Sequence, residues 1–262
     1  MGRIITSKKQ QRRNEFKSIY KHYPSSNQVI LFIHGIIEGP KQFRHLAQIA
    51  YKMGYSISIV LLPGHGKSGK YFAGTSSEEW IIYISEQMNK LRKQYEEILI
   101  VGHSMGALMT ICEMAANDKK IAGAILIDPP IKVHLWPRVI KSSITIGIKS
   151  IKLCEPYTRA EYHAISVYPI RVCDYLRGIL RYFELFILIQ YTKKQIHKMN
   201  KPILLIFAGK DEFVNLKSRN FFMKIPCRVE EIILEDSGHF CYHHTDLIRL
   251  EEAFEAFIRR FK

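Results

Sequence analysis

Apolar and polar positions follow two alternating patterns along the 262 residues of this chain. Short apolar runs predict strands at 28–35, 56–64, 97–104, 121–130, 202–211 and 229–239. Between them, segments with apolar residues every three or four positions predict helices at 40–53, 77–95, 105–116, 217–225 and 246–261. The strand runs are apolar almost throughout, which is typical of parallel strands buried on both faces. The pattern therefore predicts an α/β fold, a doubly wound, mostly parallel sheet flanked by helices.

One long segment interrupts this alternation. Residues 131–200 stand between two predicted strands and are too long for an ordinary connection. They include an apolar helical stretch with basic residues, ILRYFELFILIQYTKKQIHK at 179–198. Helices inserted beyond the strand ends would cover the crevice where open α/β sheets bind ligands. We therefore predict a core formed by 1–130 and 201–262 with a helical cap at 131–200; the alternative is a helix that packs on the body of the core.

A serine lies between two glycines where a predicted strand meets a predicted helix. The segment GHSMG at 102–106 has the pattern G-x-S-x-G. In this context the glycines permit a tight turn that presents the Ser104 hydroxyl at the strand ends. A serine that only capped the helix would explain Ser104 but neither glycine. Ser104 is the candidate nucleophile, and the backbone N–H groups of Met105 and Ile36 are the candidate oxyanion donors.

A serine nucleophile needs a base, and the base needs an acid that orients it. Asp211 follows a predicted strand 107 residues after Ser104, and His239 follows the last predicted strand 28 residues later. Both would lie at the sheet edge that carries Ser104, with His239 as base and Asp211 as acid. Asp128, in LIDPP at another strand end, is the alternative acid.

The order serine, aspartate, histidine is accompanied by further motifs. These are HGIIEGPKQFRHLA, LLPGHGKSG, GHSMGA, AGKDEFV and SGHF. Over roughly 28–262 the chain resembles the α/β-hydrolase superfamily, and within it the bacterial carboxylesterase and monoacylglycerol lipase group, also described as serine aminopeptidase-like or lysophospholipase-like. The resemblance implies the α/β-hydrolase fold, catalytic roles for Ser104, Asp211 and His239, oxyanion roles for Ile36 and Met105, and no cofactor.

The sequence departs from that group in two places. Ala107 stands where many relatives have a second glycine after the serine turn, and as a small residue it should still pack. Only about 28 residues precede the first strong strand, so we expect the usual leading hairpin to be shortened or altered.

Other histidines and aromatic residues have simpler interpretations. His103 cannot turn its ring toward the neighbouring serine hydroxyl and is predicted to be a packing or polar wall residue. His65, in PGHGKSG, is predicted to be structural. No H-E-x-x-H spacing occurs, so no metal is predicted.

The apolar stretch of the inserted segment is a candidate substrate pocket. Phe183, Phe186 and Ile187 are the candidate substrate-binding residues and would line an acyl tunnel, although the same spacing also fits core packing. Trp136 and Tyr168 are further candidates for this pocket.

The net charge of +15 is concentrated in two stretches. Residues 1–21 carry a net +6 and residues 132–198 a net +8. A basic surface attracts nucleic acid, anionic lipid or acidic substrates. No zinc-ligand spacing, RNP-like string or helix-turn-helix is present, so no nucleic-acid partner is predicted. Two interpretations stay open: peripheral contact with an anionic membrane surface, or a lysine-rich composition that maintains solubility.

The cysteines, at positions 112, 154, 173, 227 and 241, are odd in number and lack CxxC spacing. They predict neither a disulfide framework nor a zinc site. With no secretory signal and no apolar run of membrane-spanning length, we expect a cytoplasmic location. The sequence does not indicate an oligomeric state.

The predicted function is a serine hydrolase that cleaves the carboxylic ester of a small-molecule acyl substrate. A carboxylesterase or a monoacylglycerol or lysophospholipid lipase would fit, acting through an acyl-enzyme. Three alternatives stay open: an acyl thioesterase with the same machinery, a ligand-binding or signalling protein of the same fold with little or no turnover, and a membrane-surface adaptor.

Overall fold

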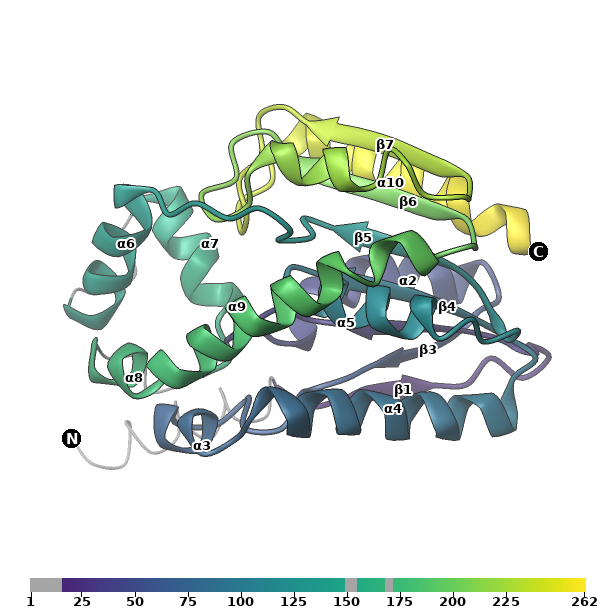
Figure 1. Ribbon diagram of the computed structural model, residues 1–262, viewed down its shortest axis with the longest axis horizontal. Helices are drawn as coiled ribbons and strands as arrows, with labels where there is room; N and C mark the ends of the chain where they lie inside the picture. Colours follow the sequence, from purple (N-terminus) through teal and green to yellow (C-terminus); the bar gives the residue numbers. More distant parts are fainter. Residues whose placement is uncertain (1–15, 149–154, 168–171) are drawn as a thin grey trace.

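A seven-stranded sheet forms the centre of the molecule. It is seen in a computed structural model that describes residues 16–148, 155–167 and 172–262. The strand order is β1-β3-β2-β4-β5-β6-β7 (Figure 1). The strands are β1 (Ile19–Lys21), β2 (Gln28–Ile33), β3 (Ser56–Ile59), β4 (Glu97–His103), β5 (Ile121–Ile127), β6 (Ile203–Ala208) and β7 (Val229–Leu234). Within this sheet only β1 is antiparallel to its neighbour, which confirms the predicted mostly parallel α/β fold.

The continuous apolar runs are explained by burial on both faces of the sheet. Every residue of β2, β3 and β6 is buried. Along β2, Val29 and Leu31 belong to one hydrophobic cluster, whereas Ile30 and Phe32 belong to the cluster on the other face. Successive side chains of a strand point to opposite faces, so a strand covered on both sides must be apolar at every position.

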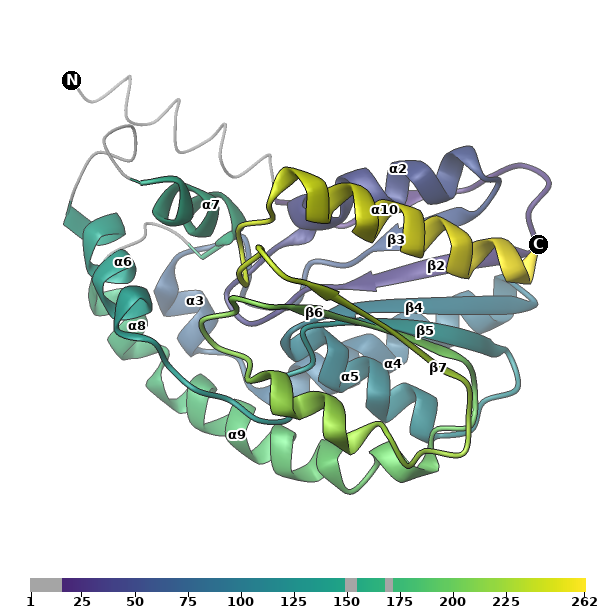
Figure 2. The ribbon, with the colours of Figure 1, turned by 90° about the horizontal axis from the view of Figure 1, so that it is seen from above.

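Helices cover the two faces of the sheet (Figure 2). One face carries α2 (Arg44–Lys52) and α10 (His244–Ile258), and the other carries α4 (Ser77–Gln94), α5 (Met105–Ala115) and α9 (Ile179–Lys193). The remaining helices are η1 (Pro40–Phe43), α3 (Gly69–Ala73), α6 (Pro137–Ile148), α7 (Pro156–Ala164), α8 (Val172–Arg177), η3 (Ile196–Lys198), η4 (Leu216–Phe221) and η5 (Arg259–Phe261). Among the described helices, none is both long and apolar enough to cross a membrane.

The boundaries differ from the prediction in a few places. The predicted helix at 40–53 is divided into η1 and α2, and the predicted helix at 217–225 is the 3-10 helix η4. The predicted strands end earlier, because their runs included the first loop residues at the sheet edge. Strand β1 and helix α3 were not predicted, since elements of three and five residues are too short to show a period.

The inserted segment has two parts that lie differently. Helices α6, α7 and α8 lie beyond the carboxyl ends of the strands, whereas α9 extends back along the body of the domain (Figure 2). There α9 contacts α5 and α4. The described part of the segment is therefore divided between helices beyond the strand ends and a helix packed on the core.

Candidate active site

Ser104 occupies a strained turn between β4 and α5. Its φ of 53° lies in the left-handed region that residues other than glycine rarely adopt. The flanking glycines are required by close packing. A Cβ on Gly106 would lie 2.0 Å from the carbonyl oxygen of Ile33, and a Cβ on Gly102 would lie 2.5 Å from that of Gly106. The start of α5 is thus packed against the end of β2, the neighbouring strand, and this leaves room for a hydrogen but not for a methyl group.

Backbone strain is concentrated at this edge of the sheet. Among the described residues, the non-glycine positions with positive φ are Ile37, Ser104, Asp128 and Asn117. The first three follow the carboxyl ends of β2, β4 and β5. Such conformations cost roughly 1–3 kcal/mol each and persist where surrounding contacts fix them, often at functional sites. The strain therefore marks this edge as a candidate site independently of the serine motif.

His239 and Asp211 form a buried pair on the loops after β7 and β6. The Nδ1–H of His239 donates to Oδ2 of Asp211 over 2.6 Å, and both residues are 3% exposed. The other oxygen of Asp211 accepts the backbone N–H groups of Phe213 and Val214, each at 2.7 Å. Burial alone lowers the pKa of His239, but the charge of Asp211 and its hydrogen bond outweigh burial, so the pKa is raised.

Asp128, the alternative acid, lies in the same buried cluster with different partners. Its Oδ1 accepts the backbone N–H of Ala208 at 2.7 Å, and its Oδ2 is 3.9 Å from Nε2 of His103. Burial, followed by the charge of Asp211, raises the pKa of Asp128 well above its usual range. Asp128 is therefore suited to a protonated, structural role, whereas Asp211 makes the short contact with His239.

The two candidate oxyanion donors follow the ends of two neighbouring strands, β2 and β4. Met105 is the first residue of α5, so its N–H is not used by the hydrogen-bond ladder of the helix. Ile36 lies in a turn in which the N–H of Glu38 donates to the carbonyl of Gly35 over 3.3 Å. Ile36 and Ser104 line one cavity.

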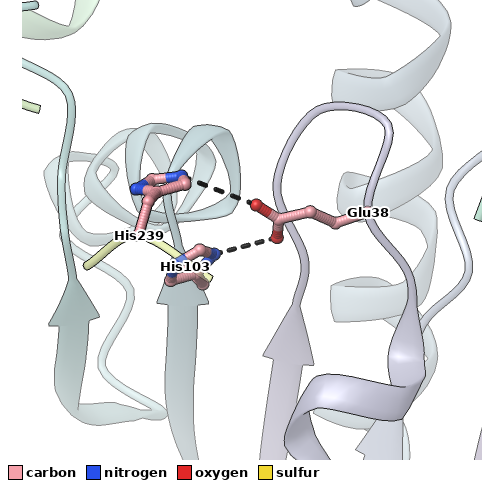
Figure 3. Close-up of side chains that lie close together, drawn as sticks. All are labelled: Glu38, His103 and His239. Carbon is pink, nitrogen blue, oxygen red and sulfur yellow. Dashed lines mark hydrogen bonds and ion pairs between the residues drawn. The ribbon is translucent and has the colours of Figure 1, made fainter. Parts of the chain in front are cut away.

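Glu38 is a site residue that the sequence analysis did not single out. Its carboxylate is buried between two histidines, His103 and His239 (Figure 3). The Nδ1–H of His103 donates to Oε2 over 2.8 Å, and Oε1 lies 3.7 Å from Nε2 of His239. The only sequence signal for Glu38 is that it is the one acidic residue in the segment HGIIEG. Its role could not be predicted from this signal, because the role depends on which side chains the fold brings near.

An apolar cavity of about 790 Å³ opens at these residues. Its lining comes mainly from the loop after β2 (Ile36–Glu38, the candidate oxyanion loop), the segment after β5, and helices α6 and α9. The lining residues are Ile36, Ile37, Glu38, Ser104, Pro130, Val133, His134, Leu135, Val139, Ile140, Ile144, Glu161, Leu176, Tyr182, Leu185, Phe186, Ile189, Phe213, Val214, His239 and Phe240.

The predicted substrate-binding residues divide between the two sides of α9. Phe186 lines the cavity, whereas Phe183 and Ile187 are outside its lining and are 64% and 69% exposed. Tyr182, Leu185 and Ile189 face the cavity with Phe186, because they share its side of the helix. Trp136 is also outside the lining and exposed, and Tyr168 lies outside the described residues.

A comparison with protein families supports the assignment of the fold. The family model described as "Serine aminopeptidase, S33" matches residues 24–245. The chain belongs to the serine aminopeptidase family. This membership, together with the observed sheet, makes the protein an α/β hydrolase.

The known proteins that this chain is similar to include lipases. A "Thermostable monoacylglycerol lipase" of Bacillus sp. (strain H-257) is 27% identical over 104 residues, and the match spans 40% of this chain and 41% of that protein. A "Monoglyceride lipase homolog" of Monkeypox virus is 22% identical over 239 residues, which cover 87% of this chain and 86% of the viral protein. A solved structure of metagenome-derived lipolytic enzymes (LipS and LipT) has a TM-score of 0.73 at 21% identity, covering 93% of this chain and 97% of that one, and supports the fold.

Two further histidines, His103 and His65, are buried. The ring of His103 lies 4.7 Å from that of His239, centroid to centroid, which fits the predicted polar wall. His65 packs edge-on against His34, Phe72 and Trp80, which fits a structural role.

Side chains that could hold a metal occur in two overlapping groups within the described residues. One is Glu38, His103 and His239; the other is Asp128, Asp211 and His239, and the potential ligand atoms of each group lie within 4.8 Å of one another. Their short contacts, however, join carboxylate to imidazole. These contacts use ligand atoms of both histidines and favour proton transfer over metal binding.

Proposed function

We propose that this protein is a serine carboxylic ester hydrolase that acts on a small substrate with an acyl chain. The observation that carries the proposal is the buried Asp211–His239 pair, 2.6 Å apart, because His239 lines the same cavity as the strained Ser104. Ser104 is the proposed nucleophile, His239 the base and Asp211 the acid that orients it. The family match and the lipase relatives support the same assignment.

The proposed reaction proceeds in two halves. His239 removes the hydroxyl proton as Ser104 Oγ attacks the ester carbonyl, and the N–H groups of Ile36 and Met105 stabilise the oxyanion. The imidazolium of His239 then donates its proton to the leaving alcohol, which leaves an acyl group on Ser104. Water activated by His239 attacks the acyl-enzyme and releases the acid. Asp211 holds the imidazole tautomer and stabilises the imidazolium throughout.

The cavity supports an acyl chain as the recognised part of the substrate. Side chains of α6 and α9, such as Ile140, Ile144 and Phe186, provide an apolar surface next to Ser104. We propose that residues 131–200 form a cap over a core of 1–130 and 201–262 and that this cap binds the chain. A monoacylglycerol or lysophospholipid fits both the cavity and the names of the relatives.

Labelling and turnover together test this proposal. A fluorophosphonate probe should add to the wild-type protein once, as read by intact mass, because only an activated serine reacts rapidly. In a series of p-nitrophenyl esters, kcat/KM should rise with acyl length and then fall when the chain exceeds the cavity. Acyl thioesters of the same lengths serve as the comparison. A preference for thioesters would indicate a thioesterase, and neither adduct nor turnover on folded protein would contradict a hydrolase.

The pH dependence of ester hydrolysis follows from the pKa of His239. This histidine acts as a base only when neutral, and Asp211 raises its pKa above the ordinary value. We therefore expect kcat/KM to fall as the pH decreases through a midpoint above about 6.5. A pH profile with a neutral ester measures this midpoint. Asp211→Asn should move it to lower pH, and an unchanged midpoint in that variant would contradict the assigned pairing.

We further propose peripheral contact with anionic membranes through α9. Leu180, Phe183, Ile187 and Tyr191 are 54–69% exposed and recur at helical spacing, in a segment (132–198) with net charge +8. Sedimentation with phosphatidylserine vesicles should show binding that weakens as salt rises from roughly 50 to 500 mM. Phe183→Asp should weaken binding, whereas Met223→Asp, at an exposed apolar residue outside the segment, should not. Equal binding of both variants would contradict this surface.

A further inference from the structure

We infer that Glu38 is a positioning residue for acyl transfer, which holds the oxyanion loop in place and fixes His103 against the base. The inference rests on the proposed function, because it assigns a role within the same reaction. Its basis is geometric: one buried carboxylate contacts the loop that carries Ile36, the ring of His103 and, at 3.7 Å, Nε2 of His239.

The first set of contacts shapes the oxyanion loop. The backbone N–H of Gly35 donates to Oε2 of Glu38 over 2.7 Å, and the side-chain amide of Gln42 donates to the same oxygen over 2.7 Å. The side chain of Glu38 therefore folds back over the turn that presents the N–H of Ile36. A Cβ on Gly35 would lie 2.6 Å from Oε1 of Glu38, so the Glu38 carboxylate can keep this position only beside a glycine.

The loop conformation requires such restraint. Ile37, a β-branched residue, has a φ of 57°, which its side chain disfavours. The N–H of Ser166 donates to the carbonyl of Ile37 over 2.8 Å, and the hydroxyl of Ser166 donates to the carbonyl of Glu38. The loop is thus restrained from outside by Ser166 and from inside by the Glu38 carboxylate. Removing the inner contact should release the strain and displace the Ile36 N–H.

The second set of contacts lies at the base. Oε2 of Glu38 accepts the Nδ1–H of His103, whose ring lies against that of His239. Oε1 is 3.7 Å from Nε2 of His239, the nitrogen that must carry the proton during acyl transfer. A carboxylate at this distance favours the imidazolium that forms in the transition state, whereas a positive charge on the neighbouring His103 disfavours it.

The charge of His103 makes this arrangement compatible with an oxyanion. An unpaired carboxylate in the cavity lining would repel the negative charge that develops on the substrate. Burial alone lowers the pKa of His103, but the charge of Glu38 and its hydrogen bond, together with the charge of Asp211, outweigh burial and raise it. The effect is mutual. Burial alone raises the pKa of Glu38, but the charge of His103 and its hydrogen bond contribute most to lowering it to about 2. Both shifts favour an ion pair in which the charge of His103 offsets that of Glu38.

Three variants test the role of Glu38. Glu38→Ala removes both sets of contacts, and kcat for p-nitrophenyl ester hydrolysis should fall about 100-fold or more, as for loss of an oxyanion donor, while KM changes less than about threefold. Glu38→Gln retains an oxygen that can accept the Gly35 N–H, so kcat should fall about tenfold. The control Glu113→Gln breaks a part-buried contact with Arg92 outside the cavity lining and should leave kcat unchanged.

A double-variant cycle tests the charge argument. His103→Asn places an amide N–H near the Nδ1 position but removes the cation, which leaves the Glu38 carboxylate uncompensated. His103→Asn should lower kcat by about 100-fold relative to the wild type, which is a larger loss than that of Glu38→Gln. The double variant should have a kcat close to that of Glu38→Gln alone, because no unpaired charge remains. A purely structural pair would lower the melting temperature in the single variants without this recovery of kcat.

The outcomes separate this inference from the proposed function. Fluorophosphonate labelling and ester turnover of the wild-type protein establish the hydrolase. If the wild type is active and Glu38→Gln and His103→Asn retain its kcat, the positioning role is wrong and the hydrolase stands. If the wild type neither reacts with the probe nor turns over esters, the proposed function itself fails. Should Glu38→Ala not fold, Glu38→Gln and the cycle still decide the question.

Discussion

Ser104→Ala should abolish ester hydrolysis and fluorophosphonate labelling. The substitution removes the proposed nucleophile while the oxyanion N–H groups and the cavity stay in place. We expect kcat to fall by about 10⁴-fold or more, since loss of a triad serine leaves only catalysis by the remaining groups. Intact mass after probe treatment and steady-state kinetics measure both effects. Thermal unfolding should show that the variant still folds, because alanine is smaller than serine and makes no new contact in the turn.

A second serine provides the matched control. Ser58 is a buried serine of β3 that does not line the cavity. Ser58→Ala should retain both probe labelling and turnover. An adduct that persists on Ser104→Ala at the same stoichiometry would place the nucleophile elsewhere and overturn the proposed mechanism.

Asp211→Asn should reduce kcat by about 10⁴-fold, the second largest effect that we expect. The amide cannot hold His239 in the tautomer that accepts the serine proton, and it cannot stabilise the imidazolium. The short contact between Asp211 and Nδ1 of His239 supports this expectation. Turnover of a p-nitrophenyl ester, compared with the melting temperature of the variant, measures the loss separately from stability.

Asp128→Asn distinguishes the two candidate acids. Asparagine can still accept the N–H of Ala208 through its carbonyl oxygen, and the raised pKa of Asp128 favours a neutral side chain there already. We therefore expect this variant to lose less than about tenfold in kcat. A loss in Asp128→Asn as large as that in Asp211→Asn would mean that the acid role is shared or reversed.

The sequence by itself determined the architecture and the order of the motifs. Strands buried on both faces must be apolar at every position, so β2 and β6 were visible as continuous runs, and the paired glycines around Ser104 marked a turn that only a hydrogen at Cα can fit. These features depend on neighbours close in the chain. Elements such as β1 gave no signal, because three residues are too few to show a period.

Only the tertiary structure decided what surrounds the proposed base. Glu38, His103 and His239 come from three separate loops and strand ends, and their contact depends on strand order and register rather than on any local pattern. The same holds for α9, where Phe186 faces the cavity and Phe183 and Ile187 face outward. Helical spacing places residues on a common side, but the packing of the helix against α4 and α5 determines which side is turned toward the cavity.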